Sequence, residues 1–225
     1  MMINTIFFDQ DNTLFNTRQH SAAAYRHALN FLASKHQLNS EQLFRDWRDI
    51  VKKSQRSQDS QLRSFSYSIA VLLKQYSLDL DDVEEVNHQL LTYIRDQIET
   101  TGGTLEFFDL KLAISKVLFT EDNSVQSQVK LQAWNLEGHF DLVITSDLIG
   151  VMKPHLDYLT YGWKRLDVKP THCLYIGDSW EKDCSLGQEH GGIGVLFGSY
   201  DHRADYCINS MMELVEILER HGGIV

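Results

Sequence analysis

The stretch Phe7-Phe8-Asp9-Gln10-Asp11-Asn12-Thr13-Leu14 contains the first residues whose types and spacing could carry out chemistry. An apolar run ends there in two aspartates and a threonine. Two carboxylates one residue apart repel each other, so placing them at the end of a buried strand indicates a bound cation, a proton relay, or both. Taken alone, Asp-x-Asp after a strand is also common in turns and helix caps. The other polar groups of the chain must therefore distinguish these interpretations.

Three later strand-like runs also end in polar groups. Thr120 follows the first of them, the segment from Thr145 to Lys153 follows the second, and Asp178 and Asp183 follow the third. In parallel α/β sheets, ligands bind at the carboxyl ends of the strands. We therefore expect these groups to share one site with the two N-terminal aspartates.

Five short apolar runs have the composition of β-strands. They are Asn4–Phe8, Lys116–Phe119, Asp141–Ile144, Cys173–Ile176 and Ile193–Phe197. Helix-compatible segments separate the later runs, at Val125–Leu136, Leu156–Leu166 and Trp180–His190. Strands that are apolar throughout and alternate with helices are typical of a parallel sheet buried on both faces. The sequence therefore predicts an α/β fold.

Residues 17–100 differ from the rest of the chain, because they are rich in Gln, Ser, Arg and Leu and contain no convincing strand. Their helical periodicity predicts four helices, at Arg18–Lys35, Ser40–Lys53, Leu62–Tyr76 and Asp81–Glu99. We expect 17–100 to be a helical domain inserted into an α/β core made of residues 1–16 and 101–225. The segment Thr101-Gly102-Gly103-Thr104 would be the return hinge.

Taken in order, the polar motifs resemble those of the haloacid dehalogenase superfamily of phosphotransferases. The matching motifs are Asp9-x-Asp11-x-Thr13, the strand-ending Thr120, Lys153-Pro154 and Gly177-Asp178-Ser179-x-x-x-Asp183. Several separate motifs in the right order are far more specific than any one of them. The resemblance spans residues 1–15 and about 104–210. It implies a Rossmann-like parallel core, with residues 17–100 as a helical cap of the family's first type.

The resemblance also implies a reaction, the hydrolysis of a small phosphomonoester. Asp9 would be the nucleophile that forms an aspartyl-phosphate, and Asp11 would protonate the leaving alkoxide and then activate water. Mg²⁺ would be the cofactor, since it prefers oxygen ligands and binds through carboxylates plus a substrate phosphate. The implied metal ligands are Asp9, the backbone carbonyl of Asp11, and Asp178.

The remaining motif residues would support this chemistry. Thr120 and Lys153 would bind the phosphate, and Thr13 would steady the loop. Ser179 and Asp183 would lie beside the metal, with Asp183 orienting a ligand or a bound water. Asp183 could instead belong simply to the polar first turn of a helix.

Some residues depart from the family pattern. Gln10 and Asn12 stand where an apolar residue and Gly are more common. Thr120-Glu121-Asp122 replaces the usual Thr-Asn-Gly, and its two acids add negative charge near a phosphate site. Two alternatives therefore stay open beside the phosphatase: a phosphomutase on the same fold, or a catalytically weak phosphate-binding or regulatory protein. A dehalogenase is disfavoured, because those relatives lack an acid at the position of Asp11.

Composition narrows the class of partner. The chain has 225 residues and a formal net charge of -10, which argues against binding nucleic acid. No segment approaches the roughly 18 apolar residues of a membrane span, and no basic, apolar leader begins the sequence. We expect a cytoplasmic monomer or homodimer that binds a small phosphate ester and no membrane. Cap residues such as Arg56 and Arg63 could contact the leaving group, although solvated arginines are the commoner case.

Overall fold

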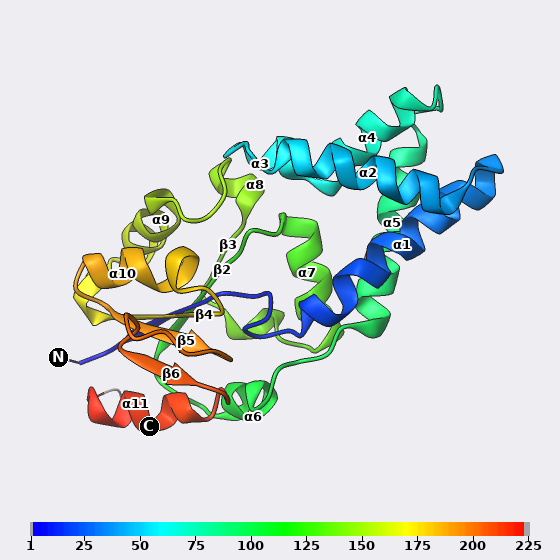
Figure 1. The fold of residues 1–225 in the computed structure, drawn as a ribbon. Helices are drawn as coiled ribbons and strands as arrows, with labels where there is room; N and C mark the ends of the chain where they lie inside the picture. The colour runs from blue at the N-terminus through cyan, green and yellow to red at the C-terminus, as the bar shows by residue number, and fades with distance from the viewer. Residues whose placement is uncertain (1, 223–225) are drawn as a thin grey trace.

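The five expected strands all form, and a sixth extends the sheet. The computed structural model describes residues 2–222, and Figure 1 shows the arrangement of the elements. Within this range the strands are β1 (Thr5–Phe8), β2 (Ser115–Phe119), β3 (Leu142–Ile144), β4 (Cys173–Gly177), β5 (Ile193–Phe197) and β6 (Tyr206–Ile208). The unexpected β6 is only three residues long and follows a polar loop, which hid it in the sequence.

All neighbouring strands are parallel, and their order is β3-β2-β1-β4-β5-β6. This confirms the predicted α/β fold. The direction of strand addition reverses between β1 and β4, which is the point where open parallel sheets bind ligands at the carboxyl ends of their strands. Asp9 and Asp178 directly follow these two strands, so the topology alone brings them to the same crevice.

β1 is buried on both faces of the sheet. Ile6 and Phe8 pack into the apolar cluster on one face, whereas Phe7 packs into the cluster on the other. The ring centroid of Phe7 lies 5.0 Å from that of Tyr175 and 6.0 Å from that of Phe119. Such dense packing fixes the strand end that carries Asp9.

Helices cover both faces of the sheet (Figure 1). On the face of Ile6 and Phe8 lie α6 (Thr104–Asp109), α7 (Ser124–Ala133) and α11 (Glu213–Arg220); on the other lie α9 (Leu156–Leu166) and α10 (Ser185–Glu189). The short α8 (Ser146–Ile149) follows β3, and single turns form at η1 (Glu137–His139) and η2 (Pro170–His172). The expected helix Trp180–His190 begins as a π-helical turn, η3 (Trp180–Cys184), before α10.

The inserted segment 17–100 is helical, as expected. Its helices are α1 (Thr17–His36), α2 (Ser40–Ser54), α3 (Ser60–Arg63), α4 (Phe65–Gln75) and α5 (Asp82–Gln97). The prediction of one helix over Leu62–Tyr76 is wrong. Ser64 adopts an extended backbone (φ -67°, ψ 150°) and caps α4 by accepting a hydrogen bond from the Tyr67 N–H, so the helix breaks there. In the described part of the chain, no helix is both long and apolar enough to cross a bilayer.

The inserted helices have an apolar core of their own. Leu43, Trp47 and Ile50 of α2 pack there with α1, α4 and α5, and the Trp47 indole N–H donates to Ser68 Oγ at 2.9 Å. This cluster is separate from the two that cover the sheet, which supports treating 17–100 as a cap. The bounds of the two domains remain a prediction.

The cap contacts the core away from its two chain connections. Asp59, just before α3, forms an antiparallel bridge with Val151 in the loop after α8. The Ser60 N–H donates to Gly150 O at 3.1 Å, and the Met152 N–H donates to Gln58 O at 3.0 Å. A cap segment is therefore paired with the backbone immediately before Lys153.

Candidate active site

Asp9 is buried at the end of β1 in a tight loop. Its backbone N–H donates to Ile176 O at 2.8 Å, and one carboxylate oxygen, Oδ2, accepts a hydrogen bond from Thr13 Oγ1 at 2.9 Å. Asn12 has a φ of 60°, in the left-handed region that Gly and Asn tolerate best. Asn is therefore compatible with this turn, and the Thr13 hydroxyl ties the loop to the Asp9 carboxylate.

Lys153 provides the positive charge beside Asp9. Its Nζ lies 2.6 Å from Asp9 Oδ1 and 2.6 Å from Asp183 Oδ1, and it also donates to Phe119 O at 3.2 Å. The Lys153 side chain is only 3% exposed. Burial opposes its charge, but the two carboxylates outweigh burial and raise the pKa of Lys153. The lysine is therefore a buried cation shared by two acids.

Asp183 lies in η3 but turns inward. Its second oxygen, Oδ2, accepts a hydrogen bond from the Ser179 N–H at 3.0 Å. A Cβ added to Gly177 would lie 2.2 Å from the Asp183 carboxyl group, so only glycine lets the carboxylate approach β4 so closely. Asp183 is thus more than a polar residue of a first helical turn. Ser179 caps η3, since its Oγ accepts from the Lys182 N–H at 3.4 Å.

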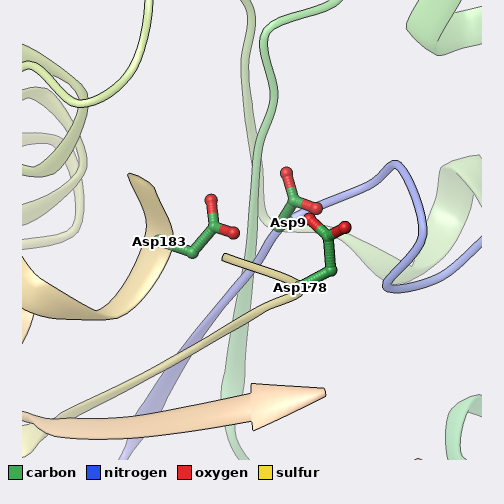
Figure 2. A group of neighbouring side chains, drawn as sticks. All are labelled: Asp9, Asp178 and Asp183. Atoms are coloured by element: carbon green, nitrogen blue, oxygen red, sulfur yellow. The ribbon is translucent and has the colours of Figure 1, made fainter. Parts of the chain in front are cut away.

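Three carboxylates converge at this edge of the sheet. Asp9, Asp178 and Asp183 each offer an oxygen within 4.8 Å of the others, and Figure 2 shows the three side chains together. Burial, with Asp183 and Asp11 adding repulsion, raises the pKa of Asp9 to about 7 against the opposing effect of Lys153. Burial also raises the pKa of Asp178 and of Asp183.

The donor set fits a hard divalent cation. It offers only oxygen atoms, and each carboxylate oxygen keeps a lone pair after accepting one hydrogen bond. Lys153 and the largely exposed Arg18, which lies 2.9 Å from Asp178, do not fully balance three acids that share so small a space. The sequence placed Asp183 beside the metal ligands, and the structure brings its carboxylate into one cluster with Asp9 and Asp178.

Asp11 lies outside this cluster and has a different partner. Its Oδ1 lies 2.5 Å from Nζ of Lys130, which is also 2.6 Å from Asp122 Oδ2. Lys130 belongs to none of the motifs named above, and we did not predict it from the sequence. Its only signal was the helical spacing Ser127, Lys130, Leu131, which places a lysine on the buried face of α7.

The acidic segment after β2 is compensated by basic residues. Thr120 is buried, its N–H donates to Ile144 O at 2.9 Å, and its Oγ1 accepts from the Asp122 N–H at 3.1 Å. Glu121 lies 2.5 Å from Nζ of Lys182 and 3.9 Å from Arg63, and Asp122 contacts Lys130. Both added acids therefore have basic partners, although Lys130 is shared with Asp11 and part of the negative charge remains.

A cavity of about 600 Å³ lies between the cap and the core segments that follow β2 and β3. Aromatic residues of the cap and polar residues of both parts line it, including Tyr25, Trp47, Phe65, Asp122 and Ser146. Of the two arginines considered from the sequence, Arg63 lines this cavity. Arg56 instead lines a separate groove with Asp49, Lys52 and Lys53.

Known proteins are similar to this chain along most of its length. A family model described as haloacid dehalogenase-like hydrolase matches residues 3–191. The glyceraldehyde 3-phosphate phosphatase of Methanocaldococcus jannaschii is 30% identical, covering 97% of this chain and 98% of the relative. The pyrophosphatase PpaX of Bacillus mycoides is 25% identical, covering 99% of this chain and 100% of the relative.

A solved structure has the same fold. It is the HAD hydrolase YfnB of Bacillus subtilis, whose crystal structure was described as bound to magnesium and revealing interdomain movement. Its TM-score is 0.70 at 21% identity, covering 97% of this chain and 100% of that one.

The charge balance around Lys153 predicts how its loss affects stability. We expect Lys153→Met to lower the free energy of unfolding by about 3–5 kcal/mol at about pH 8, because two buried carboxylates lose their partner. The deficit relative to the wild type should shrink as the pH falls toward about 5. Without Lys153, the pKa of Asp9 in the folded variant rises further above about 7. As the pH falls, the folded variant therefore binds a proton at Asp9 that the unfolded chain does not bind, and this proton uptake stabilises the folded state.

Urea denaturation in EDTA, repeated across this pH range, measures the effect. Lys116→Met is the control for loss of a buried lysine. Its Nζ donates to a backbone carbonyl, Ile114 O at 3.4 Å, and among the described residues it forms no ion pair, although the more distant Asp141 partly offsets the burial that lowers the pKa of Lys116. A Lys153→Met deficit that did not change with pH would contradict the charge balance.

Proposed function

The chain belongs to the haloacid dehalogenase-like hydrolase family, and we propose that it is a Mg²⁺-dependent phosphatase that hydrolyses a small phosphomonoester through an aspartyl-phosphate. The observation that carries this proposal is the junction of Asp9, Lys153 and Asp183 beside Asp178, at the switch point of the sheet. The phosphatase activities named for two full-length relatives support it.

In the first step, a carboxylate oxygen of Asp9 attacks phosphorus. The bond from phosphorus to the leaving oxygen breaks, and Asp11 gives that oxygen a proton, which releases an alcohol. Lys153 offers positive charge to the phosphoryl oxygens, and Thr120 offers a hydroxyl. The short contact between Lys153 and Asp9 supports this arrangement, because the same ammonium can serve the nucleophile and the phosphate.

In the second step, water attacks the aspartyl-phosphate. Asp11, now a carboxylate, takes a proton from the water, and the bond from phosphorus to Asp9 breaks. The products are inorganic phosphate and the restored Asp9. Cap residues around the cavity would limit access of other water during the first step.

Asp9, Asp178 and the Asp11 backbone carbonyl would hold Mg²⁺, with Asp183 beside them. When bound, the ion supplies positive charge that stabilises the transferring phosphoryl group. The oxygen-only cluster supports this assignment, as does the magnesium bound to the fold relative from Bacillus subtilis. Cytoplasmic location, a monomeric or homodimeric state, and the absence of nucleic-acid or membrane partners remain predictions from the sequence.

Asp9→Asn tests the nucleophile. With Mg²⁺, the wild-type protein should hydrolyse 4-nitrophenyl phosphate, and Asp9→Asn should lower kcat by about 10³-fold or more, as loss of a covalent nucleophile does. Asp157→Asn, an exposed aspartate in the first turn of α9, is the control for a general effect of charge. Activity that survives Asp9→Asn in a folded protein would show that the nucleophile is another group.

Asp178→Asn tests the metal site. We expect it to raise the Mg²⁺ dissociation constant by about 10- to 100-fold, because one of few anionic ligands becomes neutral. Isothermal titration of metal-free protein with Mg²⁺ measures this without relying on activity. Equal affinity in Asp178→Asn and wild type would exclude Asp178 as a ligand.

The cavity predicts a preference for the leaving group. Its lining contains one arginine, Arg63, and three acids, Glu121, Asp122 and Asp147. A substrate with an uncharged leaving group should therefore react with a kcat/KM about tenfold or more above that of pyrophosphate, since like charges placed together cost several kcal/mol.

Glyceraldehyde 3-phosphate and pyrophosphate are the pair of substrates to compare. Glu121→Gln should narrow the difference by releasing Arg63, whereas the exposed Glu137→Gln should not; a wild-type preference for pyrophosphate would refute the prediction.

A further inference from the structure

Lys130 is a buried lysine that the steps above do not use. It projects from the sheet-facing side of α7, beside Ser127 and Leu131, and its side chain is 5% exposed. Its Nζ contacts two carboxylates, Asp11 Oδ1 at 2.5 Å and Asp122 Oδ2 at 2.6 Å. We propose that Lys130 is a positioning residue that holds the Asp11 carboxylate in place for proton transfer to the leaving oxygen, an inference that rests on the proposed phosphatase function.

The contact leaves Asp11 able to act. Among the described residues, Lys130 is the one whose side chain hydrogen-bonds the Asp11 carboxylate, and the bond uses Oδ1 alone. The other oxygen, Oδ2, remains available to carry a proton. Lys130 is shared with Asp122, whose Oδ2 lies 2.6 Å from the same ammonium.

The ammonium is held from the other side by the segment after β2. Asp122 is fixed by the hydrogen bond from its N–H to Thr120 Oγ1, and Thr120 is fixed by its N–H bond to Ile144 O. A continuous chain of contacts therefore runs from the end of β2 through Asp122 and Lys130 to Asp11. Asp122, which stands where the family usually has the Gly of Thr-Asn-Gly, therefore anchors Lys130.

A purely structural ion pair and a positioning contact have different chemical consequences. Asp11 must protonate the leaving oxygen only when that oxygen is a poor leaving group, because a good leaving group departs as the anion. Phenyl phosphate and 4-nitrophenyl phosphate have nearly the same shape, but phenolate leaves far less readily than 4-nitrophenolate. Loss of positioning should therefore slow phenyl phosphate selectively, whereas a general structural defect should slow both esters alike.

The test compares kcat/KM for the two esters, because this constant reports the steps up to release of the phenol and excludes the later hydrolysis of the aspartyl-phosphate. We expect Lys130→Met to lower kcat/KM for phenyl phosphate about tenfold or more beyond any effect on 4-nitrophenyl phosphate. Asp122→Asn should give a smaller selective loss, and it tests the same contact if Lys130→Met does not fold. Lys116→Met, which removes a buried lysine at the opposite end of β2, should affect both esters equally.

Equal losses on both esters in folded Lys130→Met and Asp122→Asn would overturn the positioning role. Selective loss in Lys116→Met would overturn it as well, because the effect would then follow any buried lysine. Failure of the wild-type protein to hydrolyse either ester with Mg²⁺ would instead refute the proposed phosphatase function. Thermal denaturation of each variant separates these outcomes from misfolding.

Discussion

The buried ammonium of Lys153 between Asp9 and Asp183 is the interaction on which the rest of the site depends. A carboxylate alone in this position would pay a large desolvation penalty, and two would also repel each other. The three residues come from the end of β1, the loop after α8, and η3, so the two carboxylates gain their shared cation only when these segments have come together. The sheet order provides the frame, since it sets β1 beside β4.

The same principle of paired opposite charges recurs around this centre. Lys130 bridges Asp11 and Asp122, Lys182 contacts Glu121, and Arg18 contacts Asp178. Each acid of the site therefore contacts a cation, but Lys153 and Lys130 are each shared by two acids. Glu121 and Asp122 look unfavourable for phosphate binding in the sequence. In the folded protein they pair with Lys182 of η3 and Lys130 of α7, and these ion pairs join both elements to the end of β2.

The parts of this structure that depend on local pattern could be predicted, and those that depend on contacts between distant segments could not. Apolar runs and helical spacing identified five strands and most helices, and motif order identified the residues at the strand ends. The break at Ser64 was missed because a serine cap and an exposed helical serine look alike until the chain bends. Lys130 was missed because its helical spacing with Ser127 and Leu131 marks a buried face only once the position of α7 is known. The inward turn of Asp183 needed the space left by Gly177.

The pairing of Asp59 with Val151 has a consequence for how proteins of this architecture can diversify. Strand-like pairing is sensitive to register, because a shift of one residue turns every side chain to the opposite face. A change in length before α3 that shifted this pairing would therefore change the contacts of the backbone that leads to Lys153. The cap of this protein is not an interchangeable module: its evolution, or its replacement in a chimera, is constrained by the loop that carries the lysine at the centre of the site.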